Sequence, residues 1–212
     1  LHLCDRRQRQ MCIRDRYSRQ QFRLPCGSYY HLEVNEKNNI SFSDPSYILP
    51  HPELNDGLCL RLRNAVSLPR HVQAHSDAVT ELACCLCNML ESNGYIFDQK
   101  LVRSGALLHD IARLQRHHAK TGGELFLQLG YPEISQIISQ HHGLLEATLD
   151  EAAIVFLADK LIQETQRVTI EKRFADSMSK CKSPEARKAH EQQLEQARKL
   201  QDMIQSLCHI TL

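Results

Sequence analysis

The residues of this chain that are best suited to chemistry are histidines and aspartates that interrupt apolar segments. His109 and Asp110 stand side by side within the apolar stretch GALLHDIAR. Burying an imidazole and a carboxylate in such a stretch is costly unless the two groups are paired or bind a cation. Because His and Asp are ligands of divalent metals such as Mn, Fe, Co and Zn, the pair predicts a metal site.

Further polar residues of the same types interrupt other apolar segments. His75 lies 34 residues before His109, which is enough for one helix, a turn and most of a second helix. The remaining residues are His118, the doublet His141-His142, and Asp159. A lone core histidine is usually a hydrogen-bonded structural residue, but so many imidazoles and carboxylates are hard to satisfy in one small core without a cation. We therefore expect these side chains to converge inside a helical bundle.

Composition restricts the classes of protein to which the chain can belong. Its 212 residues fit one domain and a tail, and a net charge of +1 provides no overall basic field for nucleic acid. The nine cysteines are odd in number, and three of them share the apolar run LACCLCNML, which is typical of a buried helix rather than a disulfide framework. We expect a reducing, cytoplasmic location. No apolar run suits a membrane span, and the first residues lack a signal-peptide core.

The first 56 residues differ from the rest of the chain. Residues 1–20 carry six Arg and two Asp, a net charge of +4, without helical or strand periodicity. The stretch MCIRDRYS resembles translated adapter sequence, so we predict a non-native or disordered segment; the alternative is a basic arm for nucleic acid or an acidic partner. Residues 21–56 are rich in Pro, Asn and Ser around the fragments YYHLEV and ISFS. They predict a poorly structured segment: a hairpin, an extended linker or the remnant of an upstream domain.

From residue 57 to 212 the pattern predicts an all-α bundle. A short helix is expected in LCLRLRNAV, and a second helix opens after a cap at Ser67 and stops near Asn93-Gly94. Asp98 should cap a helix that carries the pair His109-Asp110 in QKLVRSGALLHDIARL, and Asp150 should cap the helix EAAIVFLADKLIQETQR.

The remaining boundaries follow from proline and glycine. Gly130-Tyr131-Pro132 separates two helices, and Gly143 is expected to end the second of them. Ser183-Pro184 opens a long polar helix with a thin apolar stripe. That stripe predicts a helix that packs with one face on the bundle or forms a homodimer with another subunit.

Five segments between residues 68 and 168 together resemble the HD-domain superfamily of metal-dependent phosphohydrolases. In order, they read HSDAV, LLHDIAR, HAKTG, ISQHHG and FLADKL. The resemblance implies an HD-domain helical bundle that binds one or two divalent transition-metal ions, namely Mn, Fe, Co, Ni or Zn, with Mg as a further candidate. The first ion would be held by His75, His109, Asp110 and Asp159. A second would be held by His118 and His141, with Asp110 bridging.

The residues alone leave neighbouring histidines as alternatives. His71 and His75 lie four apart on one helical face and could form a ligand pair. The resemblance selects His75, which makes His71 a rim residue. It also selects His118, with His117 as the alternative. His142 could share the second metal or act on the substrate.

The resemblance implies hydrolysis of a small phosphorylated substrate, such as a nucleotide, by metal-activated water. Asp110 and His142 are the expected catalytic residues, and Arg113 and Lys160 the expected phosphate-binding residues, although either cation could be a solvated helix charge. Arg167 is a weaker candidate of the same kind. The segments are most similar to small bacterial HD hydrolases, including those that cleave dinucleoside polyphosphates and those fused to a molybdopterin nucleotidyltransferase-like domain.

Two other functions fit the same residues. One is a di-iron HD-type oxygenase that cleaves C–C or C–P bonds, because metal identity cannot be deduced from the ligand set. The other is a non-catalytic ligand-sensing module attached to a transferase. The chain has no GxxxxGK loop, which disfavours a kinase or NTPase. Tyr131-Pro132 precedes the His doublet and belongs to a helix boundary, so it does not indicate an HD-GYP phosphodiesterase.

Overall fold

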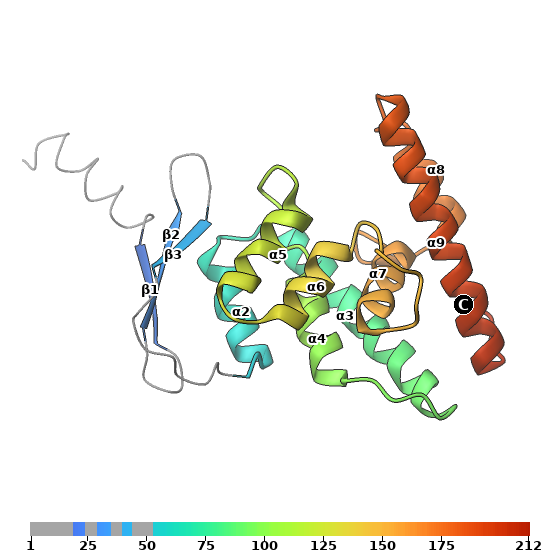
Figure 1. Ribbon diagram of the computed structural model, residues 1–212, viewed down its shortest axis with the longest axis horizontal. Coiled ribbons are helices and arrows are strands. Elements are labelled where there is room, and N and C mark those ends of the chain that lie inside the picture. The colour runs from blue at the N-terminus through green and yellow to red at the C-terminus, as the bar shows by residue number, and fades with distance from the viewer. Residues whose placement is uncertain (1–18, 24–28, 35–39, 44–52) are drawn as a thin grey trace, which may run out of the picture.

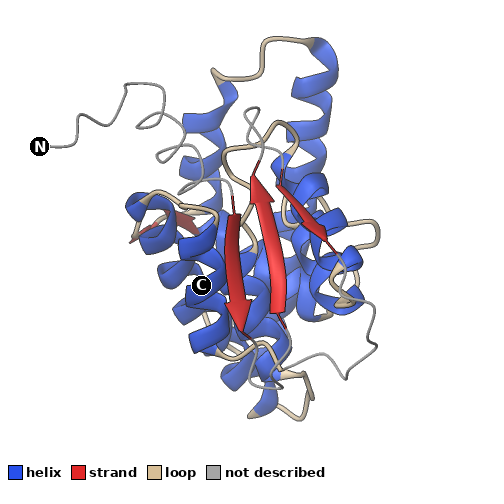
Figure 2. Cartoon of the chain, turned by 90° about the vertical axis from the view of Figure 1, so that its left-hand side faces the viewer, coloured by secondary structure: helices blue, strands red, loops and turns tan. Residues whose placement is uncertain are grey.

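The computed structural model of this protein describes residues 19–23, 29–34, 40–43 and 53–212. The first three ranges are strands β1 (Arg19–Arg23), β2 (Tyr29–Val34) and β3 (Ile40–Ser43). They pair antiparallel in the order β1-β2-β3, as Figure 2 shows. The fragments YYHLEV and ISFS therefore pair as a hairpin. The prediction for residues 1–20 falls almost wholly outside the described residues, and the predicted domain boundaries stay predictions.

The described part of the chain from residue 53 is helical, which confirms the all-α bundle (Figure 1). Its helices are α2 (Asp56–Ala65), α3 (Arg70–Glu91), α4 (Gln99–Leu108), α5 (His118–Gln128), α6 (Pro132–Gln140), α7 (Glu151–Leu161), α8 (Ile170–Met178) and α9 (Pro184–Cys208). No helix among these is both long and apolar enough to cross a membrane.

Short polar side chains begin several helices, as the sequence predicted. Asp98, Asp150 and Ser183 each accept a hydrogen bond from a backbone N–H in the first turn of α4, α7 and α9. The prediction for α3 was wrong in detail. Its N-cap is Pro69, whereas Ser67 has φ +53° and lies in the turn after α2. The left-handed backbone there turns the chain before the proline starts the helix.

Helix α7 lies at the centre of the bundle and packs against α3, α4, α6, α8 and α9. Its residues from Ala152 to Leu161 are all buried, and an apolar sequence on every side suits such a position. Asp159 and Lys160 are therefore charged groups in the most deeply buried helix. Cys84, Cys85 and Cys87 are free thiols on α3, although Cys85 faces solvent rather than the core.

Three predicted helices, α4, α6 and α7, end earlier than expected. Helix α4 ends at Leu108, so His109 is its C-cap and Asp110 lies in the following turns. Hydrogen bonds from Ile111 N to Leu108 O and from Arg113 N to Asp110 O tighten the chain there. Asp110 therefore lies outside the regular helix, in which its side chain would point about 100° away from that of His109. Helix α6 likewise ends at Gln140, before Gly143.

Helix α7 ends at Leu161 and not near residue 167. A tight hairpin follows, formed by β4 (Ile162–Gln163) and β5 (Gln166–Arg167). Glu164, in its turn, has φ +56°, a conformation that its sequence does not signal. The Glu164 carbonyl accepts a hydrogen bond from His75 Nδ1, so a tertiary contact replaces the helical one. Helix α8, which the sequence did not predict, comes next.

Candidate metal centre

One group of potential ligands joins three helical segments that are distant in the sequence. His75 comes from α3, His109 from the end of α4 and Asp159 from α7. One potential ligand atom from each lies within 4.8 Å of the others. The closest pair is His75 Nε2 and Asp159 Oδ1 at 3.0 Å, and His109 Nε2 lies 3.8 Å from the same oxygen.

A second group consists of histidines from the ends of two helices. His118 is the first residue of α5, and His141 and His142 follow α6. Their potential ligand atoms also lie within 4.8 Å of one another. His118 Nε2 lies 2.8 Å from His142 Nε2 and 3.3 Å from His141 Nε2. Two imidazole nitrogens that bind one cation at about 2.1 Å each are separated by a similar distance.

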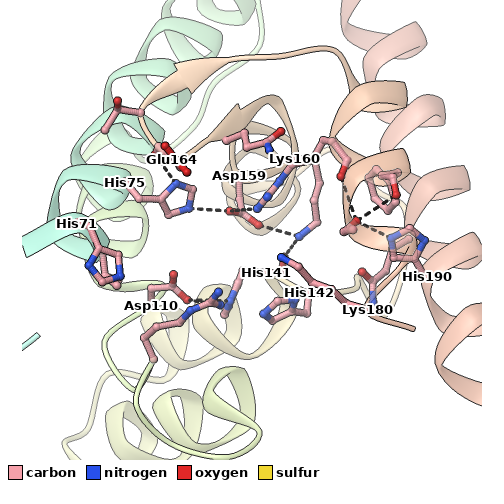
Figure 3. Close-up of a pocket in the computed structure, with 18 of the residues that line it drawn as sticks. His71, His75, Asp110, His141, His142, Asp159, Lys160, Glu164, Lys180 and His190 are labelled. Atoms are coloured by element: carbon pink, nitrogen blue, oxygen red, sulfur yellow. Dashed lines mark hydrogen bonds and ion pairs between the residues drawn. The ribbon is translucent and has the colours of Figure 1, made fainter. Parts of the chain in front are cut away.

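Asp110 lies between the two groups, because each of its oxygens approaches a different one. Figure 3 shows Asp110 with His75, His141 and Asp159 around the cavity. Oδ2 is 3.8 Å from His109 Nε2 in the first group. Oδ1 is 3.1 Å from His118 Nε2 and 3.6 Å from His141 Nε2 in the second group. The carboxylate therefore has the placement that a ligand shared by two cations requires.

Backbone carbonyls orient three of the imidazoles. The Nδ1 atoms of His75, His109 and His141 lie 2.9, 2.7 and 2.6 Å from the carbonyl oxygens of Glu164, Ala106 and Ile138. An N–H at Nδ1 that donates to each carbonyl directs Nε2 of each ring at the centre, and that nitrogen can bind a metal when it carries no proton. His109 Nε2 is buried and has no hydrogen-bond partner among the described residues. An orphaned buried acceptor beside two carboxylates fits a divalent metal.

The carboxylates at the centre are held in the charged form. Burial tends to raise the pKa of Asp110, but hydrogen bonds from His118 and His141 outweigh it, and the pKa is lowered. Burial also tends to raise the pKa of Asp159. The charge of Lys160 and the hydrogen bond from His75 outweigh this effect, and the pKa lies well below its ordinary value. Two buried carboxylates that stay ionised supply the negative charge that a cation site needs.

Two imidazoles of the centre, His109 and His142, have lowered pKa values, whereas the pKa of His75 is raised. Burial lowers the pKa of His109 to about 4, despite the opposing charges of Asp110 and Asp159. Burial and the neighbouring His141 and Lys160 lower the pKa of His142 to about 2. These rings are neutral near pH 7 and keep a lone pair for a metal. Burial would also lower the pKa of His75, but the hydrogen bond and charge of Asp159 raise it overall.

Two cations predicted to bind phosphate lie beside the ligand groups. The Lys160 ammonium is buried and donates hydrogen bonds to Asp159 Oδ2 at 2.7 Å and to the His141 carbonyl at 2.9 Å. The Arg113 side chain is half exposed, and its Nη1 lies 3.1 Å from His118 Nε2 and 3.6 Å from Asp110 Oδ1. Both residues line the same cavity.

The other candidates lie away from the ligand groups. His71 is exposed at the edge of the cavity, and His117 is an exposed, left-handed residue that precedes α5. Arg167 is exposed in β5 and does not line the cavity. Arg173 was not predicted as a site residue, although its Nη2 lies 4.0 Å from Asp159 Oδ1. It belongs to α8, a helix that the sequence did not predict.

A cavity of about 840 Å³ opens over the centre. Its walls include Asp110, Asp159 and His141, and side chains from α8 and α9 extend it on the far side. This volume is in the range of sites that hold a ligand of nucleotide size.

Comparison with known proteins gives one family. The HD domain family matches residues 72–163. Uncharacterized protein MJ0778 of Methanocaldococcus jannaschii is 37% identical over 131 residues, which cover 52% of this chain and 76% of that protein. Ribonuclease Y of Acidothermus cellulolyticus is 33% identical and that of Fervidobacterium nodosum 35% identical, each over 117 residues and 52% of this chain.

The match covers only 23% and 22% of those two ribonuclease Y proteins. No solved structure matches the chain significantly. HD domains bind divalent metals and are generally metal-dependent hydrolases, which agrees with the chemistry of the two ligand groups. The chain therefore belongs to the HD-domain family.

Proposed function

We propose that this protein hydrolyses a small phosphoester, with a nucleotide as the preferred class of substrate, at a centre that holds two divalent transition-metal ions. The observation that carries the proposal is the position of Asp110, with one carboxylate oxygen toward each group of ligands. His75, His109 and Asp159 would hold one ion with Asp110. His118, His141 and His142 would share the other. A donor set so rich in imidazole favours Mn, Fe, Co, Ni or Zn over Mg.

Such ions, when bound, would lower the pKa of a water ligand and would polarise a phosphoryl oxygen. The side chains around them would orient the substrate. Arg113 can turn from His118 toward a phosphoryl oxygen, because its side chain is 46% exposed. Lys160 uses two of its three donors on Asp159 and the His141 carbonyl, which leaves one N–H for the substrate.

The substrate class is supported by the cavity and by the relatives. A volume of about 840 Å³ is far larger than a phosphate group alone needs. The ribonuclease Y relatives are named for the cleavage of RNA, in which a phosphodiester is hydrolysed. The net charge of +1 favours a small nucleotide over a long nucleic acid.

Metal analysis combined with a hydrolysis assay tests this function. Purified protein should contain about one to two transition-metal ions per chain and should release phosphate or nucleotide from phosphomonoesters or phosphodiesters when supplied with Mn or Co. Asp110→Ala removes the shared ligand, so bound metal should fall and the rate should drop by at least about a hundredfold.

Asp202→Ala, an exposed aspartate on α9, is the matched control and should behave like the wild type. Asp110→Asn keeps the side-chain volume and serves if the alanine variant does not fold. An active Asp110→Asn protein with unchanged metal content would refute the proposal. Oxygen-dependent cleavage without hydrolysis would indicate the di-iron oxygenase instead.

A further inference from the structure

The cavity extends well beyond the metal centre, toward the C-terminal helices. Residues of α8, of α9 and of the loop between them line this part: Arg173, Phe174, Ser177, Lys180, Cys181, Ala186, His190 and Gln193. All of them lie after residue 163, where the match to the HD domain family ends. This part of the wall therefore lies outside the family match, whereas the potential metal ligands lie within it. Figure 3 shows two residues of this wall, Lys180 and His190, on one side of the cavity.

The added wall is basic. Arg173 and Lys180 are its charged residues, and none of the lining residues from α8, α9 or their loop is acidic. The acidic groups of the cavity, Asp110, Asp159 and Glu164, come from other elements. The Arg173 side chain is 29% exposed, and its one polar contact with the residues that the structure describes is a long one, 4.0 Å to Asp159. Its guanidinium therefore retains donors for a ligand.

The same wall contains a buried histidine, His190. His190 is 8% exposed, although it lies on the polar helix α9. Its Nε2 and the Ser177 hydroxyl are 2.7 Å apart, and its ring packs edge-on against Phe174 with the ring centres 4.8 Å apart. His190 Nδ1 is buried without a hydrogen-bond partner among the described residues. A histidine with an unused polar atom is costly in a purely structural wall, because buried polar groups normally have partners.

We infer that the wall formed by α8 and α9 is a second anion subsite, in which Arg173 and Lys180 bind a phosphate group of the substrate other than the one that is hydrolysed. The inference rests on the proposed function, since it takes the metal centre as the place of the scissile phosphoryl group. It narrows the substrate to small compounds with two separated phosphate groups. Arginine and lysine both suit a phosphate, and two cations make the contact selective for a dianionic group.

Titration with bisphosphonates tests the subsite without any hydrolysis, because metal-activated water does not hydrolyse the P–C bond of a simple alkylphosphonate. The probes are propane-, pentane- and heptane-bisphosphonate, each with a terminal phosphonate at both ends, and the alkylphosphonates of the same length as single-anion controls. Affinities are measured by calorimetry on the full chain loaded with Mn. At least one bisphosphonate should bind about tenfold or more tightly than its matched alkylphosphonate, which is the effect expected of a charge-assisted contact.

Arg173→Ala and Lys180→Ala should each reduce this ratio by about threefold to tenfold, with the larger loss at the less exposed Arg173. Lys172→Ala is the matched control, because Lys172 is exposed on α8 and does not line the cavity. It should leave the ratio unchanged. Ratios near one for every chain length, or a ratio that neither variant changes, would overturn the subsite.

The two proposals fail separately. A protein that hydrolyses phosphoesters but does not prefer bisphosphonates retains the proposed function and loses the subsite. A protein that prefers bisphosphonates through Arg173 and Lys180 but hydrolyses nothing retains the subsite, and its catalytic assignment is wrong.

Discussion

At the level of single residues, Asp159 is held by contacts on both of its carboxylate oxygens. It is buried in α7, and its two oxygens have separate partners, His75 at 3.0 Å on Oδ1 and Lys160 at 2.7 Å on Oδ2. Lys160 also donates to the carbonyl of His141, in the second ligand group. One ammonium therefore fixes the orientation of an aspartate in one group and the backbone of a histidine in the other. This links the two groups before any metal binds.

Lys160→Met should weaken the metal-free fold. The substitution keeps most of the side-chain volume but leaves Asp159 Oδ2 and the His141 carbonyl without their donor. Removing one partner of a buried ion pair costs about 3 to 5 kcal/mol, so the free energy of unfolding in the presence of a chelator should fall by that order. Urea denaturation measures it. Lys172→Met, an exposed lysine on α8, should have little effect. Equal stability of Lys160→Met and the wild type would contradict this assignment.

At the scale of elements, close helix contacts set the positions of the ligands. A Cβ at Gly105 on α4 would come within 2.8 Å of two Ile137 atoms on α6. Gly105 and Ile137 each lie one turn before a ligand, His109 and His141, whose rings are 5.1 Å apart. The absence of a side chain at Gly105 therefore lets α4 and α6 approach closely enough to bring these imidazoles together.

Gly105→Ala should destabilise the fold and loosen the metal site. Overpacking of this kind typically costs about 1 to 3 kcal/mol, less up to about 1 kcal/mol that alanine recovers as the better helix former. The midpoint of urea denaturation and the affinity for Mn should both fall. In Gly57→Ala on α2, the new Cβ makes only an ordinary 3.4 Å contact, and that control should be neutral or stabilised. Unchanged Mn affinity in a destabilised Gly105→Ala protein would show that the close packing of α4 and α6 does not set the positions of the metal ligands.

At the scale of the whole molecule, α9 is part of the bundle. Its apolar stripe is thin, but Ala197, Leu200 and Ile204 are fully buried in the core cluster that includes residues of α3 and α7. The stripe was predicted either to pack on the bundle or to form a homodimer, and the structure shows that it packs on the bundle. Homodimer formation stays a prediction. The packing also places His190 and Gln193 in the wall of the cavity.

Leu200→Ala should destabilise the single chain. Truncation of a fully buried leucine typically costs about 2 to 5 kcal/mol, and that loss should appear as a lower free energy of unfolding in urea. Lys199→Ala changes the neighbouring exposed position and should have almost no effect. If Leu200→Ala instead left stability unchanged and altered the molar mass measured by light scattering, the stripe would serve another subunit.

The sequence alone predicted the class of fold, which the structure confirms, and the residue types of the candidate centre. Apolar periodicity and capping residues such as Asp98 and Asp150 are local signals, because burial on one face and a cap each depend on residues close in the chain. The residue types also predicted the chemistry, since His and Asp are costly in apolar helices unless they bind something. The resemblance to HD domains then chose among adjacent histidines, and the structure brings His75 and His118 together with the others.

The orientations of these residues depend on tertiary contacts, which the sequence does not reveal. The ends of α4 and α7 depend on contacts with distant segments, such as the hydrogen bond between His75 and the Glu164 carbonyl, 89 positions apart. A local sequence pattern does not indicate a contact with a distant segment, so α4 and α7 were predicted to be longer than they are. The basic wall of α8 and α9 was missed for the same reason. Arg173 and Lys180 are ordinary surface charges in the sequence, and only the packing of α9 against α7 and α8 makes them part of the cavity.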